Sequence, residues 1–544
     1  MLRAAVCHND LAKQNTLYIC STNLMPCHGQ NGIPNFPAWK VQRPFRIHTF
    51  CLFLTRHSSM LAATINIARM SRNRASAVTR TRAIAAHMST AAPEGQSVLF
   101  ESNGSSRKYV LNRAKKLNAL NSEMLQLIRP QVEEWSKSDL CKVIVGTGVG
   151  RAFCAGGDVA TVLNDSLDDS TRSRAIEFFK EEFELDYVLS ALPKPYVALL
   201  DGITMGGGVG LAISAPFRVA TEKTVFAMPE TKIGYCPDVG ASFFLSRMDG
   251  EIGTYLALTS ETLVGREVFE HGLATHFIPS RAISNLLDRL ADLPTSNPER
   301  VNLAIEELHA ERQSDEPLGK LTGATRQALD SAFAHDSVEL IVQSLEEFTS
   351  ASDRGVSEWA KKTLETLHMR SPTSLKVSLS AIRRGKTMTL FEALQMEMGI
   401  ATSYCSGASS DFRAGISAVL IDKTQGRPAW SPSSLKDVSP MILDRFFSKE
   451  SPYRSNMPEL SSPEFLHQGA RDPMRFALPT EEDIALAVKS ISNERPMALP
   501  VLLSRLDDVR SGKAGVREKV LDVLKRRCKW EVDDGSISTV CWKQ

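Results

Sequence analysis

The sequence has no long apolar run and no regular pattern of cysteine and histidine. A helix that crosses a bilayer needs about 18 or more consecutive apolar residues, and the best candidate, around residues 50–54, is far shorter. None of the ten cysteines is paired at CxxC spacing, and no histidine cluster stands beside them. These absences argue against a membrane span, a zinc site and a disulfide framework, and they fit a reducing intracellular compartment.

Acidic residues are nearly missing from residues 1–93, which hold 11 Lys and Arg and a single acid, Asp10. The remainder has 53 basic and 61 acidic residues, so this acidic body is poorly suited to coating a phosphate backbone. Residues 60–92 carry five arginines, many Ser, Thr and Ala and no acid, which is typical of a mitochondrial presequence. We therefore predict a leader over 1–93, a presequence at 60–92 and a location in the mitochondrial matrix. Met60 or Met70 is the expected initiator, which makes residues 1–59 an extension of the gene model.

The body alternates between strand and helix patterns from Ser97 to about Ile278. Asn103-Gly104 predicts a hairpin turn, and Ser122 is the expected cap of the first helix. Residues 282–398 are mainly helical, and a tail with helical periodicity over 479–534 follows Pro- and Ser-rich breaks. This alternation predicts an α/β fold. The expected strands are 98–100, 108–111, 143–145, 196–200, 218–220, 225–227 and 274–278, and the first expected helices are 122–137, 174–192 and 206–214.

Two glycine-rich loops follow predicted strands. Gly206-Gly207-Gly208 precedes an apolar helix, and Gly156-Gly157 comes after the 143–145 strand. Glycines let a ligand approach the backbone, and they leave N–H groups available at a helix start. A phosphate loop fits poorly because no Lys-Ser/Thr follows, and close packing of helix on strand is the alternative. Two such loops can supply two donors to one oxygen, an oxyanion hole that contributes about 3–4 kcal/mol per donor in acyl transfer.

Three long motifs cover these loops and the segment after them: FCAGGD, KPYVALLDGITMGGGVGLAISAPFRVAT and FAMPETKIGYCPDVGASFFL. They resemble the crotonase (enoyl-CoA hydratase/isomerase) superfamily and, within it, the 3-hydroxyisobutyryl-CoA hydrolases. SPTSLKVSL at 371–379 and DFRAGISAVLIDK at 411–423 also match, so the resemblance runs from about Val98 to Lys436. It implies a crotonase-like ββα superhelix with a helical C-terminal region, a hydrolase domain over 97–436, and a partly helical extension over 437–544. It also implies that the backbone amides of Gly157 and Gly207 form the oxyanion hole.

The carboxylates distinguish two reactions within this superfamily. Its hydratases carry one glutamate just after the glycine triplet and another in a later Pro-Glu motif. In this chain the first position is Gly210, whereas the second is Glu230. Because hydration needs two acid/base groups around one water, Gly210 counts against a hydratase and matches the hydrolases. The hydrolase pattern adds Asp238, and Glu182 matches a substrate-contact position. Without the resemblance, Glu230 would read as a helix-start charge, Asp238 as a turn former and Glu182 as a solvated helix face.

The resemblance makes Glu230 the catalytic carboxylate, either as a nucleophile that forms an anhydride or as a general base for water. Asp238 either binds the substrate's 3-hydroxyl or supports Glu230. Substrate contacts are expected from Glu182, Gly207, Glu230 and Asp238. No metal and no permanent cofactor are implied, since the CoA thioester is the substrate. Cys154 lies beside the Gly156-Gly157 loop, but no histidine stands near it in the sequence, so small-residue packing is expected there.

The resemblance therefore implies hydrolysis of 3-hydroxyisobutyryl-CoA to the free acid and CoA in valine catabolism, with enoyl-CoA hydratase as the rival activity. A structural rival exists, because the family resembles a protein of the small mitochondrial ribosomal subunit in some fungi and plants. The expected partner is the acyl-CoA, with no membrane. A homo-oligomer (related crotonases are often trimers), ribosome association and activity on 3-hydroxypropionyl-CoA stay open. The tail residues that could touch rRNA are Lys525, Arg526, Arg527 and Lys529.

Overall fold

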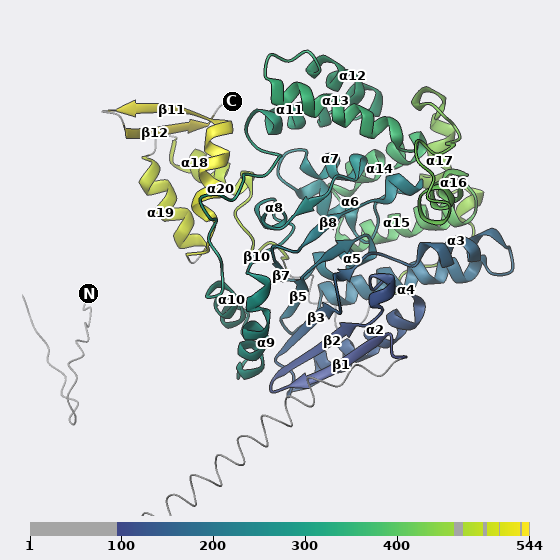
Figure 1. The fold of residues 1–544 in the computed structure, drawn as a ribbon, viewed down its shortest axis with the longest axis horizontal. Coiled ribbons are helices and arrows are strands. Elements are labelled where there is room, and N and C mark those ends of the chain that lie inside the picture. The colour runs from purple at the N-terminus through teal and green to yellow at the C-terminus, as the bar shows by residue number, and fades with distance from the viewer. Residues whose placement is uncertain (1–94, 462–471, 493–497, 511, 534–535, 543–544) are drawn as a thin grey trace, which may run out of the picture. The chain divides into compact units, whose positions relative to one another are not determined.

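A computed structural model describes residues 95–461, 472–492, 498–510, 512–533 and 536–542 (Figure 1). These belong to one unit, residues 91–544. The predicted leader, with its presequence and the segment before Met60, lies outside the described residues. None of the described helices combines the length and the apolar character that crossing a membrane requires.

The larger sheet has six strands in the order β1-β2-β3-β5-β7-β10 (Figure 1). β1 and β2 form an antiparallel hairpin around Gly104, whose φ of 53° suits the predicted Asn103-Gly104 turn. Every other pairing in this sheet is parallel, and parallel strands need long crossover connections between them. The strands are β1 (Val98–Asn103), β2 (Ser106–Leu111), β3 (Val143–Gly148), β5 (Tyr196–Leu200), β7 (Phe217–Ala220) and β10 (His276–Phe277).

This sheet separates two hydrophobic cores. Alternate residues of a strand point to opposite faces, so Val143 and Val145 of β3 join one core while Ile144 joins the other. The smaller core lies under two helices, α9 (Ile283–Asp292) and α10 (Pro298–Glu306). The larger core includes the helices that precede β3 and β5, and it continues beneath the site. These helices are α2 (Ser122–Lys137), α3 (Val159–Leu167) and α4 (Arg172–Ser190).

A second sheet of four short strands has the order β4-β6-β8-β9. Its first three strands are parallel, and each carries a loop of the site at its end. The turn η2 (Glu230–Ile233) follows β8, and α5 (Gly207–Ile213) follows β6. The strands are β4 (Ala152–Cys154), β6 (Ile203–Met205), β8 (Val225–Ala227) and β9 (Leu263–Val264).

Helices make up most of the chain after the two sheets. One of them, α15, packs against α4 and so reaches the site from the C-terminal part of the domain predicted over 97–436, called the family domain below. They are α6 (Ala241–Phe244), α7 (Ile252–Thr259), α8 (Arg266–Glu270), α11 (Gly323–Phe333), α12 (Val338–Phe348), α13 (Arg354–Met369), α14 (Pro372–Gly385), α15 (Leu390–Cys405), α16 (Asp411–Ile416), α17 (Pro440–Phe447), α18 (Glu481–Ser492), α19 (Leu499–Val509) and α20 (Val516–Arg527).

Two local predictions were wrong. The cap of α2 is Asn121 rather than Ser122, because the Asn121 side chain accepts a hydrogen bond from the backbone N–H of Met124. The helical pattern predicted as far as Asp534 ends at Arg527. There the chain enters a hairpin of β11 (Cys528–Asp533) and β12 (Ser536–Trp542), in which pairing between the two neighbouring strands overrides the helical periodicity.

Candidate active site

The two glycine loops meet at the start of α5. Gly206 caps the helix with a φ of 49°, and Gly207 is its first residue. The other loop is fixed around Gly157, since Leu120 donates to the carbonyl of Gly156 and accepts from the N–H of Asp158. A Cβ placed on Gly156 would lie 3.7 Å from the amide nitrogen of Gly207. The structure therefore brings both predicted oxyanion loops together, while the role of the Gly157 and Gly207 amides stays a prediction.

Each glycine of this helix start leaves room for a particular neighbour. A Cβ on Gly206 would lie 3.0 Å from Oε1 of Glu230. A Cβ on Gly207 would overlap Oε1 of Glu182, and one on Gly208 would overlap the carbonyl of Cys154. The triplet thus serves close packing of helix on strand at Gly208, and it lets two carboxyl groups lie against the backbone at Gly206 and Gly207.

The three predicted carboxylates lie together in the interior. Glu182 comes from α4, Glu230 begins the turn η2, and Asp238 lies in the loop before α6; their exposed fractions are 2, 6 and 5 %. The solvated helix face that Glu182 suggested by itself is therefore wrong. One carboxylate oxygen each of Glu182 and Glu230 has no hydrogen-bond partner among the described residues. Their catalytic and substrate-binding roles stay predictions.

Two further buried acids belong to this cluster, and the sequence did not single them out. Asp186 lies one turn after Glu182 on α4, and Glu397 comes from α15. The Glu397 carboxylate accepts hydrogen bonds from the N–H of Gly240 at 2.6 Å, the N–H of Ser242 at 2.8 Å and the Ser242 hydroxyl. It therefore holds the loop that carries Asp238. A sequence signal existed, since Glu397 is the lone acid in the apolar run of its helix, MEMGIATSYC.

The five acids lack an ion-pair partner among the described residues, although the charge of Lys232 acts to lower the pKa of Glu230. No ion pair joins any of them to Lys, Arg or His within the described part of the chain. Burial raises the pKa of Glu182 well above its usual range, and the neighbouring Asp238 and Glu230 raise it further. Burial and Asp238 likewise raise the pKa of Glu230. Burial, with the charge of Glu397, raises the pKa of Asp238 to about 8, and burial raises that of Glu397 to about 7.

Such a cluster keeps several protons at neutral pH, because burial and like charge both disfavour the ionised form. It can therefore offer a carboxylate and a carboxylic acid side by side, which is the requirement for paired acid–base chemistry. The described residues include no group of three or more His, Cys, Asp or Glu placed to hold a metal ion. Cys154 is buried, which raises its pKa to about 12, so packing rather than nucleophilic attack accounts for it.

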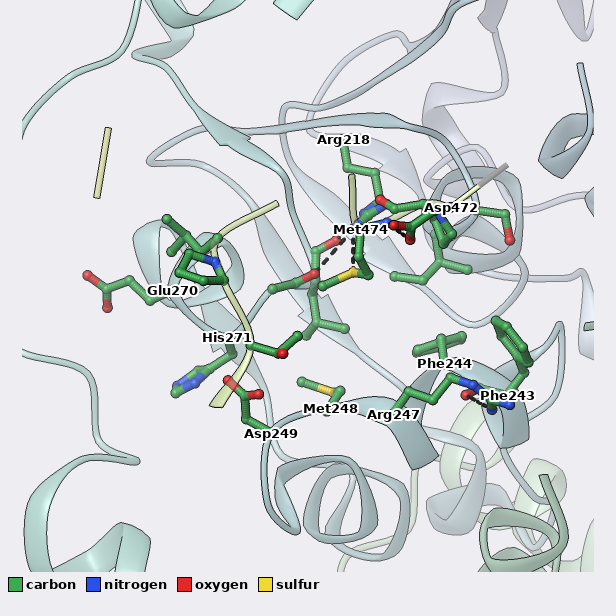
Figure 2. Close-up of a pocket in the computed structure, with 18 of the residues that line it drawn as sticks. Arg218, Phe243, Phe244, Arg247, Met248, Asp249, Glu270, His271, Asp472 and Met474 are labelled. Carbon is green, nitrogen blue, oxygen red and sulfur yellow. Dashed lines mark hydrogen bonds between the residues drawn. The ribbon is translucent and has the colours of Figure 1, made fainter. Parts of the chain in front are cut away.

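Two cavities lie around this region. One of about 290 Å³ is lined by Leu120 and Asp158, the residues that flank Gly157, and by parts of α2, α3 and α4. None of the five site acids lines this cavity. Figure 2 shows another, of about 360 Å³, lined by residues of the family domain and by 472–480 and Lys519. Arg218 there donates to the carbonyls of Leu273 and Pro473, and none of the five site acids lines this cavity.

The C-terminal extension is held to the family domain by buried charges. Glu481 of α18 pairs with Arg326 of α11 at 2.9 Å, and with Arg526 and Arg527 at 2.7 and 3.0 Å. Lys519 of α20 pairs with Asp249 at 2.6 Å. Two of the four basic residues proposed to touch rRNA are therefore engaged within the protein. Lys525 and Lys529 are the two that are exposed.

The chain belongs to the enoyl-CoA hydratase/isomerase family, whose sequence model matches residues 106–447. Two solved structures support the fold. A carnitinyl-CoA dehydratase from Mycobacterium thermoresistibile has a TM-score of 0.58 and 30% identity, and covers 68% of this chain and 99% of its own. An enoyl-CoA hydratase from Rhodobacter sphaeroides has a TM-score of 0.57 and 28% identity, over 68% and 100%. The predicted crotonase-like fold with a helical C-terminal region is confirmed.

Curated relatives fall under two names. The 3-hydroxyisobutyryl-CoA hydrolase, mitochondrial, of Danio rerio is 41% identical over 379 residues, 70% of this chain and 96% of that protein. The small ribosomal subunit protein mS47 of Neurospora crassa is 42% identical over 449 residues, 80% of this chain and 86% of that protein. The predicted grouping with the thioester hydrolases of this family is confirmed, as is a mitochondrial location.

Proposed function

We propose that this chain hydrolyses 3-hydroxyisobutyryl-CoA to 3-hydroxyisobutyrate and CoA in valine catabolism. The observation that carries the proposal is the meeting of Glu182, Glu230 and Asp238 at the start of α5, where Gly210 provides no carboxylate. Relatives of the same family that bear this activity in their names, such as that of Gallus gallus at 41% identity, support the choice of substrate.

In the proposed reaction the thioester oxygen lies between the amides of Gly157 and Gly207. Attack on the carbonyl carbon places negative charge on that oxygen, and two fixed N–H donors stabilise the resulting oxyanion more than the neutral thioester. The two loops approach closely, since a Cβ placed on Gly156 would lie 3.7 Å from the Gly207 nitrogen, and this supports the arrangement. Neither a metal nor a permanent cofactor enters this scheme.

The carboxyl cluster handles the protons. Hydrolysis forms a bond from a water oxygen to the carbonyl carbon, breaks the C–S bond and leaves one proton on the CoA sulfur. Glu230, when ionised, either attacks the carbonyl to give an anhydride that water then opens, or takes the proton of the attacking water. Asp238, with a pKa of about 8, is mostly protonated at neutral pH, so it can donate to the substrate's 3-hydroxyl or to Glu230.

The test follows free CoA release from 3-hydroxyisobutyryl-CoA by the purified protein. Glu230→Gln is expected to lower kcat at least about a hundredfold, since the substitution removes the reacting carboxylate. Asp238→Asn is expected to lower kcat/KM about tenfold or more. Glu184→Gln is the matched control, because Glu184 lies on the same helix as Glu182 but faces Arg129 and Ser461. Equal rates for wild type and Glu230→Gln would refute the mechanism, and rapid hydration of crotonyl-CoA would favour the hydratase instead.

Association with the small subunit of the mitochondrial ribosome is a second candidate role. The observation in its favour is the match to the Neurospora crassa protein, which covers 80% of this chain where the hydrolases of Gallus gallus and Danio rerio cover 64% and 70%. An mS47 of Schizosaccharomyces pombe is also similar, at 39% identity. The inward pairing of Arg526 and Arg527 leaves Lys525 and Lys529 as the exposed members of the four basic residues predicted to touch rRNA.

Co-sedimentation with mitochondrial ribosomes tests this role. We expect the full chain to sediment with the small subunit and a variant lacking residues 450–544 to remain in the supernatant. Glu230→Gln should sediment like wild type, because it changes the hydrolase site alone. Absence of the full chain from the ribosome fraction would remove this candidate and leave the hydrolase proposal untouched.

A further inference from the structure

The position at which hydratases of this superfamily carry a glutamate is not empty of carboxylate in this chain. Gly210 has no side chain, but a Cβ placed there would overlap Oδ2 of Asp186 and lie 2.7 Å from the Cβ of Val239. The carboxyl group thus comes from α4 rather than from α5. A glutamate at position 210 and an aspartate at 186 exclude each other by volume.

The two helices fit together through this exchange. Glu182 and Asp186 are four residues apart on α4, which puts them on one face. Gly207 and Gly210 are three residues apart on α5 and also share a face. Glu182 fills the space over Gly207, and Asp186 fills the space over Gly210. One row of carboxyl groups therefore lies along one row of glycines, and Glu182 connects Asp186 to Glu230 and Asp238.

Asp186 is deeply buried and receives no hydrogen bond. Its exposed fraction is 3 %, and neither oxygen has a partner among the described residues. An ionised carboxylate so placed would lack both solvent and donors, which is costly in a protein interior. A protonated carboxylic acid is neutral and avoids most of this cost.

The titratable groups that face Asp186 are carboxyl, phenol and thiol groups, each of which is neutral when protonated. Burial raises the pKa of Asp186 well above its usual range, and the charges of Glu182, Asp238 and Glu397 raise it further. The hydroxyls of Tyr109 and Tyr196 form a hydrogen bond of 2.5 Å, and the Tyr196 hydroxyl donates to the carbonyl of Leu211. The facing groups are Glu182 of α4, Asp238 of the loop before α6, Glu397 of α15, Tyr109 of β2, Cys154 of β4 and Tyr196 of β5.

We propose that Asp186 is a positioning residue of the thioester-hydrolysing site, an inference that rests on the proposed function. It fills the space left by Gly210 and, by its volume, keeps the Glu182 carboxyl over Gly207, in the row that leads to Glu230 and Asp238. It does not reach the reacting atoms. Its proton keeps a further negative charge away from the oxygen that becomes negative during acyl transfer.

A consequence for the pH dependence follows from this placement. When Asp186 ionises at alkaline pH, its charge repels the oxyanion and the carboxylates beside it, so kcat falls. Asparagine has nearly the same shape, keeps an N–H donor and cannot ionise. Asp186→Asn should therefore work at neutral pH and show its alkaline fall at higher pH, since the ionisation of Asp238 remains.

The experiment measures kcat and KM for CoA release from 3-hydroxyisobutyryl-CoA across the pH range in which the protein stays folded. We expect Asp186→Asn to keep kcat within about threefold at neutral pH, to leave KM nearly unchanged, and to move the alkaline limb of kcat up by about one pH unit or more. Asp186→Ser, a smaller neutral donor, should move that limb in the same direction if the asparagine variant does not fold. Glu184→Gln is the control and should keep the wild-type limb.

An alkaline limb in either folded variant that coincides with that of wild type would overturn the inference. This outcome differs from failure of the proposed function, in which wild type itself releases no CoA. A tenfold or greater loss of kcat in Asp186→Asn at neutral pH would also overturn the inference, since it would mean that the ionised form is the one required.

Discussion

Carboxyl groups and glycines are paired residue by residue in this site. Each of Glu182, Asp186 and Glu230 lies against one glycine of the segment 206–210. A Cβ at Gly207 or Gly210 would overlap the carboxyl there, and one at Gly206 would crowd Oε1 of Glu230 at 3.0 Å. The cost of burying acids is reduced because the acids stay protonated, as their raised pKa values indicate. The glycines are therefore required by what packs on them as much as by the backbone that they form.

Gly207→Ala tests this pairing. The new Cβ would overlap Oε1 of Glu182 and lie 3.3 Å from Cδ1 of Leu120, so the Glu182 carboxyl must move. We expect kcat for CoA release to fall at least about a hundredfold, because displacements near 1 Å in a reacting site have effects of this size. Circular dichroism should show that the variant is folded. Gly355→Ala is the control, since its Cβ would meet only Oδ1 of Asp353, at 3.2 Å; full activity of Gly207→Ala would contradict the pairing.

At the scale of elements, the extension is attached to the family domain by charge as well as by apolar contact. α18 and α20 place Glu481, Arg526 and Arg527 against Arg326 and Asp330 of α11. Burial alone would raise the pKa of Glu481, but Arg326 and Arg526 lower it, so the carboxylate is ionised in the folded protein. One carboxylate thus pairs with three arginines, and its loss would leave their charge to Asp330 and Asp522.

Glu481→Gln is expected to destabilise this attachment by about 3 kcal/mol, the range found when one partner of a buried ion pair is removed. The neighbouring Glu482 is exposed, and Glu482→Gln should have little effect. Hydrogen exchange followed by mass spectrometry would show loss of protection in α18 and α20 of the first variant, with β3 and β5 unchanged. Equal protection in both variants would show that apolar packing alone holds the extension.

At the scale of the whole molecule, stability depends on pH through buried groups whose effects oppose each other. Burial, with the charge of Lys513, lowers the pKa of His276 from 6.5 to about 4, so the folded state binds this proton less readily than the unfolded chain. Its contribution is complete above pH 6.5 and is lost as the pH falls toward 4. Asp238 and Glu397 act the other way, since their raised pKa values remove stability as the pH rises toward 7 and 8.

His276→Gln isolates the first effect. Between pH 6.5 and 4 the free energy of unfolding of wild type should fall relative to that of the variant by about 3 kcal/mol. Urea titrations of both proteins at several pH values in this window measure the difference. A constant difference across the window would show that His276 titrates alike in the folded and unfolded states.

Local patterns in the chain carried much of the fold. The hairpin at Asn103-Gly104 and the bounds of α2 and β5 follow from turn residues and apolar spacing over a few residues. The short strands β4 and β6 did not, because a strand of three residues has too little periodicity to detect and its partners lie far along the chain. The hairpin after Arg527 did not either, because the helical spacing of α20 was extended into its strands. The site shows the same division. Glu230 and Asp238 stand in a recognisable motif, whereas Asp186 and Glu397 lie on helices whose patterns name no chemistry.

The sequence by itself determined the family, the two glycine loops and the absence of a glutamate at Gly210, because each is written in contiguous residues. Only the tertiary structure decided what fills that absence. Asp186 lies 24 residues before Gly210, and which face of α4 meets α5 depends on packing across the whole core. The same holds for Arg526 and Arg527, whose charges are plain in the sequence but whose partners on α11 and α18 are not. Burial and partnership, which set the protonation of an acid and the availability of a base, arise from the folded chain alone.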